Sequence, residues 1–305
     1  MNTLYNKEEI RIIGVDDGGT KTRAAVYDGA GNLHTEAFGG CGHVILSYDT
    51  AKSSILSAIR GVWDDRCEFI AVGAAGASSG ELSGRLSEEL TAEFGIKTIA
   101  MSDAELALNA AFGPIADGML VISGTGSVVF LRKNGTILRA GGWGHILGDG
   151  GSAYCTGLYA LRTITSLRDY AIPDEELENA VFAELGIDGI AGLVKYVYAP
   201  ERSKADLAKI APVIDRLAEN GNANAEDILW KSADILADDA AAVLRRSGMD
   251  SVNIALTGGH ITHSDTLRMN FEQILRLKMD KTCRLHFLTN DIAPTLAAYR
   301  LWSDT

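Results

Sequence analysis

GVDDGGTKT, residues 14–22, joins an apolar strand that begins at Arg11 to a second strand over 22–27 through a turn built of glycines. Strand-like runs on both sides of a short glycine turn are typical of a β-hairpin. A second turn at 28–32 leads into a third strand over 33–38. The stretch therefore predicts that the chain opens with a β-meander.

The same pattern returns farther along the chain. A strand over 118–122 runs into the turn SGTGS at 123–127, and two more strands follow over 128–140. The glycine turns of the two meanders lie roughly 102–107 residues apart, which is the size of one α/β domain. We therefore predict an internal duplication, with a boundary near 112–117, where Gly113-Pro114 breaks a helix.

The remaining segments alternate between helix and strand in the first half and become mostly helical from 152 to 248. Alternation of this kind indicates an α/β fold with a mixed sheet. We expect helices over 50–63, 80–94, 264–278 and 293–302, and strands over 69–73, 97–100, 251–256 and 284–288. Within 152–248, apolar residues fall at helical spacing in 158–167, 210–217 and 228–244.

The composition is that of a folded protein with an acidic balance. Hydrophobic residues make up 47% and charged residues 22% of the 305 residues, a length sufficient for two domains. The formal net charge of −12 argues against nucleic acid and anionic membranes as partners. The 4 cysteines form no CxxC pair, which argues against structural zinc, an iron–sulfur cluster and a disulfide framework. Since the start carries no apolar stretch of signal-peptide length, a cytoplasmic location is expected.

Three glycine turns that each follow a strand are the candidates for a binding site, at 16–22, 123–127 and 256–260. Glycines let backbone N–H groups approach a phosphate closely, and neighbouring Thr or Ser hydroxyls add donors. One such turn is weak evidence, but two related by a duplication would hold one polyphosphate from both sides. The first turn lacks the Gly-Lys pair of a Walker A loop, and the second lacks the third glycine of a dinucleotide fingerprint.

Five motifs together resemble the sugar-kinase/Hsp70/actin superfamily, and within it the BadF/BadG/BcrA/BcrD-type family that includes N-acetylglucosamine and glucosamine kinases. They are GVDDGGTKT, SDAELALNAAF, ISGTGS, GGWGHILGDGGSAY and LTGGH, spread from about Ile12 to Trp302. The resemblance implies an α/β fold of two duplicated RNase H-like (actin-like ATPase) domains around an ATP-binding cleft. The domains would be 1–114, with the C-terminal helix 292–305 packed on it, and 115–291.

The resemblance also implies an activity. It points to a kinase that uses ATP and Mg²⁺ to phosphorylate a hydroxyl of an amino sugar, foremost N-acetylglucosamine with a 6-phosphate product. Glucosamine or another hexose is the alternative substrate, and a homodimer is the implied assembly. A rival from another class is a non-catalytic protein that binds ATP and sugar for regulation.

The resemblance assigns each motif a role. Asp16 would organise Mg²⁺ through water, and Asp103 would be the general base. The first phosphate loop would be Gly18, Gly19, Thr20 and Lys21, and the second Gly124, Thr125, Gly126 and Ser127. Gly258 and Gly259 would line the adenosine, and Gly142, Trp143, Gly144, Asp149 and Ala153 would contact the sugar.

The residues themselves leave structural alternatives open. Asp103 opens a helix within Ser102-Asp103-Ala104-Glu105, which has the pattern of a capping box. Asp16 has the position of a turn aspartate that caps its own backbone. Asp149 has the position of an N-cap for the helix after Ser152, and Trp143 that of a core or hinge aromatic.

Two positions depart from the family pattern. Asp17 stands where glycine is usual, and an extra carboxylate beside phosphates would repel them unless it points away or assists the metal. The stretch 39–43 lacks the asparagine with which N-acetylglucosamine kinases contact the sugar. Either His43 replaces that asparagine, or the preference for an acetamido group is lost.

Overall fold

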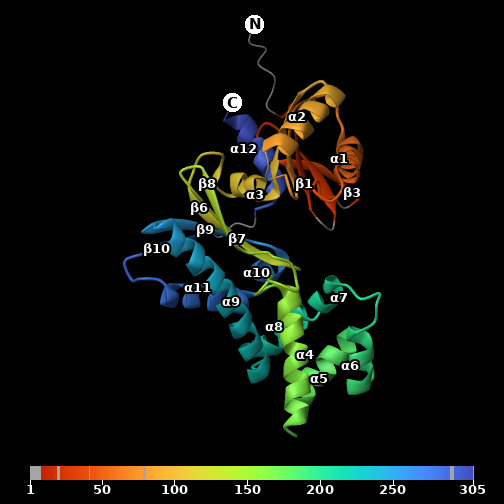
Figure 1. Ribbon diagram of the computed structural model, residues 1–305, viewed down its shortest axis with the longest axis vertical. Helices are drawn as coiled ribbons and strands as arrows, with labels where there is room; N and C mark the ends of the chain where they lie inside the picture. The colour runs from red at the N-terminus through yellow and green to blue at the C-terminus, as the bar shows by residue number, and fades with distance from the viewer. Residues whose placement is uncertain (1–7, 19–20, 41, 78–79, 289–291, 305) are drawn as a thin grey trace. The chain divides into compact units, whose positions relative to one another are not determined.

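A computed structural model describes the chain at residues 8–18, 21–40, 42–77, 80–288 and 292–304 (Figure 1). The chain divides into two compact units. The first unit comprises residues 1–118 and 292–305, and the second comprises 119–291. Each unit is built on its own five-stranded sheet.

The sheet of the first unit has the strand order β3-β2-β1-β4-β5. Its strands are β1 (Arg11–Asp17), β2 (Thr22–Tyr27), β3 (Leu33–Gly39), β4 (Cys67–Ala74) and β5 (Lys97–Ser102). The first three form the antiparallel meander, whereas β1, β4 and β5 run parallel. The carboxyl ends of these three parallel strands therefore meet at one edge, where open α/β sheets commonly bind ligands.

Helices cover both faces of this sheet. They are α1 (Tyr48–Val62), α2 (Gly80–Phe94), α3 (Asp103–Phe112) and α12 (Ala297–Ser303), with a 3-10 turn at Pro294–Leu296. On one face, α1 and α2 bury Ile55 and Leu86 against Ile13 and Val72. On the other, the C-terminal segment packs so closely that a Cβ at Gly14 would lie 1.9 Å from the carbonyl oxygen of Thr295. Only glycine at this position of β1 allows that approach.

The sheet of the second unit repeats the first, with the order β10-β9-β6-β7-β8. Its strands are β6 (Gly118–Ser123), β7 (Ser127–Lys133), β8 (Thr136–Gly141), β9 (Ser251–Thr257) and β10 (Arg284–Leu288). Here β6, β7 and β8 follow one another as the meander does, and β9 runs parallel to both β6 and β10. The two sheets therefore share one topology, as the predicted duplication requires.

The helices of the second unit form two groups with separate cores. They are α4 (Ala153–Asp169), α5 (Glu175–Leu185), α6 (Gly189–Val197), α7 (Lys204–Ala208), α8 (Ala211–Glu219), α9 (Ala223–Ser247), α10 (Gly259–His263) and α11 (Asp265–Lys278). The second half of α9 packs with α11 on the sheet. The first half of α9 packs with the helices α4, α5, α6, α7 and α8 (Figure 1). Together they form a second hydrophobic cluster, whose buried residues include none from a strand.

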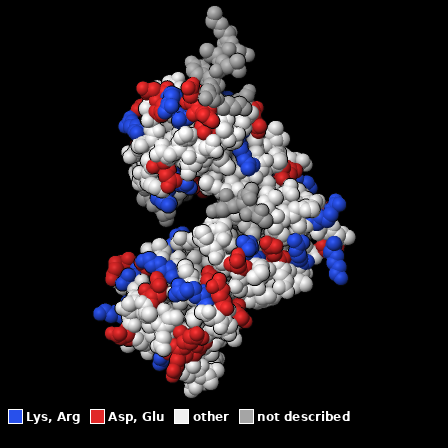
Figure 2. Space-filling model, turned by 180° about the vertical axis from the view of Figure 1, so that it is seen from behind, with Lys and Arg blue, Asp and Glu red and all other residues white. Residues whose placement is uncertain are grey.

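Several predicted boundaries move in the structure. The expected helix over 293–302 begins with a 3-10 turn at Pro294 and becomes α-helical only at Ala297. The helix expected after Ser152 begins at Ala153, with Ser152 as its N-cap. No helix in the described part of the chain is long and apolar enough to cross a membrane. Acidic and basic side chains are interspersed on the face that Figure 2 shows.

Candidate active site

Asp16 and Asp17 end strand β1 and point to opposite faces of the sheet, as consecutive strand residues do. Asp17 is completely buried, and its Oδ1 accepts a hydrogen bond of 2.5 Å from the hydroxyl of Thr22. A Cβ at Gly42 would lie 2.9 Å from that oxygen. The extra carboxylate is therefore packed inside the first unit, against the segment that follows β3.

Asp16 is partly exposed and lies among other acids. Burial raises its pKa to about 6, and the neighbouring carboxylates of Asp103 and Asp17 add to the rise. Among the described residues no hydrogen bond to the Asp16 side chain is found. The backbone closes the turn, where the N–H of Gly18 donates to the carbonyl of Lys21 over 3.1 Å.

This concentration of negative charge fits a divalent cation. In the described part of the chain no three His, Cys, Asp or Glu side chains form a metal-binding cluster. Mg²⁺ does not need one, because it commonly keeps several waters and is held by one or two carboxylates together with substrate phosphates. The chemistry of Asp16 matches that mode of binding.

Asp103 lies directly after β5, as the first residue of α3. Ser102 is the N-cap, and its Oγ accepts from the N–H of Glu105 over 3.2 Å. The Asp103 side chain is exposed, and its Oδ1 accepts only a local bond of 2.9 Å from the N–H of Ala104. Capping is therefore the work of Ser102. The carboxylate of Asp103 faces solvent at the sheet edge where Asp16 also lies.

The first predicted phosphate loop is described in part. Gly19 and Thr20 lie outside the described residues. Lys21 is exposed, and its Nζ lies 5.1 Å from the centre of the Phe38 ring. The stem of Lys21 therefore crosses onto β3, with the ammonium group held over an aromatic face.

The second predicted phosphate loop is bonded to the predicted sugar segment. The hydroxyl of Ser127 donates to the carbonyl of Gly150 over 2.7 Å, and the N–H of Ala153 donates to the carbonyl of Gly124 over 2.8 Å. Thr125 is exposed at the tip of the loop. These bonds join the loop, the segment before α4 and the start of α4 into one rigid piece of the second unit.

Asp149 is held in an unusual backbone conformation within this piece. Its φ is 56°, a left-handed value that is uncommon outside glycine, and its side chain is buried. A Cβ at Gly126 would lie 2.9 Å from its Oδ2, and the Nζ of Lys204 lies 3.9 Å from the same oxygen. The expectation that Asp149 could be the N-cap of the next helix is wrong, because Ser152 is that cap.

Trp143 is not a core residue. Its side chain is 67% exposed, and the guanidinium of Arg139 lies 4.5 Å from its ring centre. The flanking Gly142 and Gly144 have φ values of 68° and 88°. A side chain at Gly142 would also meet Val128 at 2.7 Å, so this stretch needs its glycines to turn the chain after β8.

The predicted adenosine turn lies against the second phosphate loop. Gly258 has a φ of 96°, and a Cβ there would lie 2.6 Å from the backbone of Ser123. Gly259 begins α10. The next residue, His260, is buried with its pKa lowered to about 4 by desolvation, and its Nε2 lies 2.9 Å from the hydroxyl of Thr156. His260 therefore ties α10 to α4.

His43 lies beside the buried Asp17. Burial raises the pKa of Asp17 to about 6, against the opposing effects of its bond to Thr22 and of nearby His43, while Asp103 raises it further. The structure thus gathers Asp16, Asp17, His43 and Asp103 in the first unit. It gathers the second phosphate loop, the sugar segment and the adenosine turn in the second unit.

Sequence reasoning missed Lys204, the cation beside Asp149. Lys204 opens the short helix α7, far along the chain from Asp149. No local pattern marks it, because the pairing arises only from the packing of α7 against α4.

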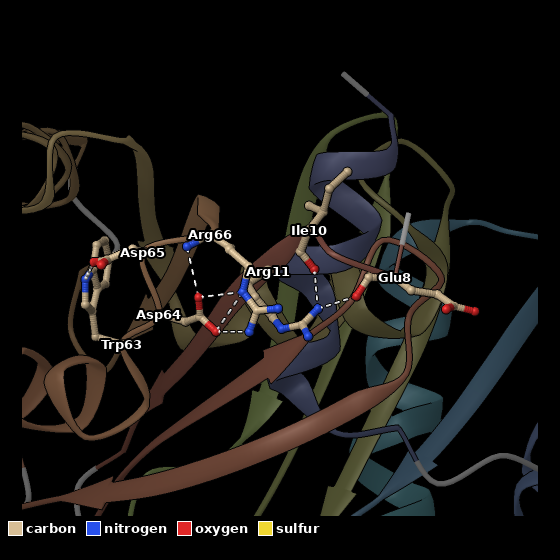
Figure 3. Close-up of polar contacts among 7 residues, drawn as sticks. All are labelled: Glu8, Ile10, Arg11, Trp63, Asp64, Asp65 and Arg66. Atoms are coloured by element: carbon tan, nitrogen blue, oxygen red, sulfur yellow. Dashed lines mark hydrogen bonds and ion pairs between the residues drawn. The ribbon is translucent and has the colours of Figure 1, made fainter. Parts of the chain in front are cut away.

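A hollow lies at the opposite end of β1 from Asp16, and we interpret it as structural and not as a binding site. Arg11, His34, Asp64 and Arg66 are among its lining residues. Figure 3 shows that Arg11 donates to the backbone oxygens of Glu8 and Ile10 and that Arg66 pairs with Asp64. Its arginines are thus already bonded, and the hollow lies away from the carboxyl ends of the strands.

Comparisons with known proteins point to one group. Residues 13–282 match the BadF/BadG/BcrA/BcrD ATPase family. The N-acetylmuramic acid/N-acetylglucosamine kinase of Clostridium acetobutylicum is 29% identical over 294 residues, which cover 92% of this chain and 95% of that protein. The N-acetyl-D-glucosamine kinase of Dictyostelium discoideum is 26% identical, with 84% and 87% covered.

A solved structure agrees with the fold. A candidate N-acetylglucosamine kinase from Chromobacterium violaceum superposes with a TM-score of 0.70 and 25% sequence identity, over 96% of this chain and 99% of that one. The duplicated actin-like α/β fold predicted from the motifs is confirmed by this match and by the two sheets of equal topology.

Proposed function

This chain belongs to the BadF/BadG/BcrA/BcrD ATPase family, as its motifs predicted, and from that premise we propose that it phosphorylates the 6-hydroxyl of N-acetylglucosamine with ATP. The observation that carries the proposal is the setting of Asp103. Its carboxylate is exposed beside Asp16 and is not needed as a cap, because Ser102 has that role. Both relatives compared above are named as kinases of this sugar.

Asp103 is the general base in this proposal. A sugar hydroxyl is a weak nucleophile until a base accepts its proton as the transition state forms. The sugar oxygen then bonds to the γ-phosphorus, the bond from that phosphorus to the bridging oxygen breaks, and ADP leaves. An exposed carboxylate at the carboxyl end of β5 can accept that proton without breaking any contact that holds the fold.

The glycine loops bind the phosphates. In this proposal, backbone N–H groups of the two loops donate where charge develops, apart from those of Gly18 and Gly124, which already donate to the carbonyls of Lys21 and Gly126. Gly258 and Gly259 leave room for the adenosine. Asp16 would hold Mg²⁺ through water, and the charge that such an ion supplies would neutralise phosphate charge. Two hydrogen bonds hold the second loop in place. The Ser127 hydroxyl donates to the carbonyl of Gly150, and the carbonyl of Gly124 accepts from the N–H of Ala153.

Asp149 binds sugar hydroxyls, with 142–144 and Ala153 shaping the pocket. A non-glycine residue kept at a φ of 56° is strained, and such strain is concentrated at functional sites. A cytoplasmic location, which the sequence analysis expects, is part of this proposal. The homodimer that the family resemblance implies stays a prediction, which light scattering tests.

Replacement of Asp103 by Asn tests the base. We expect turnover to fall by about 10²–10⁴, the usual contribution of a positioned base, while sugar and ATP still bind. Asp265→Asn is the matched control, because Asp265 also follows a serine N-cap as the first residue of a helix. The measurement is ADP release over a panel of sugars, with binding by calorimetry.

Two outcomes would contradict the proposal. Near-normal turnover of Asp103→Asn would return Asp103 to a structural role. Binding of sugar and ATP by the unaltered protein without sugar-dependent ADP release would favour the regulatory alternative.

A further inference from the structure

The carboxylate of Asp149 is buried, yet it accepts no hydrogen bond from any described residue. Its side chain is only 6% exposed, and in the described part of the chain Lys204 is the one cation within 4 Å. An ionised carboxylate that is taken out of water is costly unless it is paired or hydrogen-bonded. Lys204 is therefore the group that compensates the charge of Asp149.

Both oxygens of the Asp149 carboxylate are in reach of solvent. Among the described residues, the polar side-chain atoms that lack both solvent contact and a hydrogen-bond partner are Oδ2 of Asp17 and Nδ1 of His43. Neither belongs to Asp149. A hydroxyl group can reach the places that water reaches, so the oxygens of Asp149 can bind one although the rest of the side chain is enclosed.

The backbone at Asp149 is fixed independently of the side chain. Its carbonyl accepts a hydrogen bond of 3.3 Å from the N–H of Ser152. A Cβ at Gly151 would lie 2.6 Å from the carbonyl oxygen of Ser232, so the segment packs closely on α9. These contacts keep the backbone at its left-handed φ, and they leave the direction of the carboxylate to other groups.

Lys204 is brought to Asp149 by the short helix α7, which it begins. This helix packs on α4 so closely that a Cβ at Gly157 would lie 2.2 Å from the carbonyl oxygen of Leu207. No side chain fits between the two backbones at that point, so the distance between the helices is fixed. Because α4 starts directly after the segment of Asp149, one helix positions both members of the pair.

The two charged groups are too far apart for a hydrogen bond and close enough to attract each other. Nζ of Lys204 lies 3.9 Å from Oδ2 of Asp149, whereas a hydrogen bond from nitrogen to oxygen is about 2.7–3.2 Å long. Opposite charges this close attract more strongly where water is largely excluded. The ammonium group therefore stabilises the carboxylate without occupying the lone pairs with which it accepts hydrogen bonds.

We infer, on the basis of the proposed function, that Lys204 is the positioning residue of the sugar site. It compensates the charge of Asp149 and fixes the direction of the carboxylate, whose free lone pairs then accept sugar hydroxyls. Lys204 acts through Asp149 and touches neither the sugar nor the phosphate. It therefore supports the affinity for the sugar, whereas the transfer step depends on Asp103.

The test is a double-mutant cycle on sugar affinity, measured by calorimetry and as KM for N-acetylglucosamine. Lys204→Met keeps a long unbranched side chain without the charge and should weaken sugar binding by about 10–100-fold, the equivalent of one hydrogen bond to a charged group. Lys204→Arg should recover most of the affinity, because it restores the charge. In both variants kcat should change by less than about threefold, since the lost interaction is one of binding.

The second arm of the cycle shows whether Lys204 acts through Asp149. Asparagine tolerates a left-handed φ, so Asp149→Asn removes the charge and keeps the backbone. In that protein, Lys204→Met should change sugar affinity by less than about twofold. Losses that multiply in the double variant would overturn the positioning role. If Asp149→Asn binds too weakly to measure, the comparison of Lys204→Arg with Lys204→Met decides.

Lys209→Met is the matched control. Lys209 is the C-cap of the same short helix, and its Nζ pairs with Asp206 over 3.0 Å. We expect this variant to keep the KM for the sugar. Melting curves identify a variant that fails to fold.

The outcomes separate the inference from the function on which it rests. No sugar-dependent turnover by the unaltered protein would overturn the proposed function. Turnover by the unaltered protein together with an unchanged KM in Lys204→Met, or an equal loss in Lys204→Met and Lys204→Arg, would overturn only the role of Lys204.

Discussion

Single side chains of this protein do work that their position in the sequence does not reveal. Asp103 follows Ser102 directly and Asp149 lies three residues before Ser152, and in the structure these two serines cap the helices. The motif alone left both roles open for each aspartate. Only hydrogen bonds distinguish them, because serine and aspartate are equally good caps.

His260 gives a residue-scale prediction about acid stability. Its pKa is lowered from 6.5 to about 4 by burial, so the folded state disfavours its protonation. Since the unfolded chain binds the proton more readily, stability falls as the pH drops from about 6.5 to about 4. The loss from this group is on the order of 3 kcal/mol.

Urea unfolding at pH 7 and pH 4.5 measures that loss. We expect His260→Gln to unfold with less dependence on pH than the unaltered protein. His263→Gln, at an exposed histidine of the same helix, should leave the dependence unchanged. An unchanged slope in His260→Gln would assign the acid sensitivity to other groups.

At the scale of elements, the sequence predicts secondary structure best where short glycine turns separate strands. Both meanders are visible because their turns are short and local, and the strand over 22–27 was predicted to its observed ends. Helices α5, α6 and α7 were not resolved individually, because they are short and are stabilised by packing on α4 and α8. Likewise Asp17 ends β1 whereas His43 lies in the segment between β3 and α1, and only the folded chain brings them together.

Gly14 gives a prediction for packing between elements. Gly14→Ala places a Cβ 1.9 Å from the carbonyl oxygen of Thr295, in backbone that cannot move aside as a flexible side chain would. We expect a loss of about 1–3 kcal/mol or more in the free energy of unfolding. Gly84→Ala is the control, since a Cβ there meets nothing within 4 Å and alanine favours the helix by about 1 kcal/mol. A stable Gly14→Ala protein would show that the C-terminal segment is not tightly packed on β1.

At the scale of the whole molecule, the proposed reaction uses groups from both units on one phosphate. Water must be kept from that phosphate, or ATP would be hydrolysed without transfer. We therefore expect the units to draw together when N-acetylglucosamine and a non-hydrolysable ATP analogue are both bound. The chain passes between the units twice, near Gly118 and near Ile292, and these passages are where the backbone would bend.

Small-angle scattering measures this change. The radius of gyration should fall at saturation with both ligands and fall less with either one alone. The Asp149→Asn protein, weakened in sugar binding, is the control for an effect of nucleotide only. An unchanged distance distribution at full occupancy would argue for a rigid enzyme.

The first unit is completed by residues from both ends of the chain. Gly14 and Tyr27 contact Thr295, the latter through hydroxyls 2.8 Å apart, and Arg300 donates to the backbone oxygen of Ala111. On the ribosome, the second unit is therefore synthesised in full before the first has received its last helix. Until then, α12 is missing from the face of the first sheet that α3 also covers. We therefore expect the first unit to complete its packing only after residues 119–291 have been synthesised.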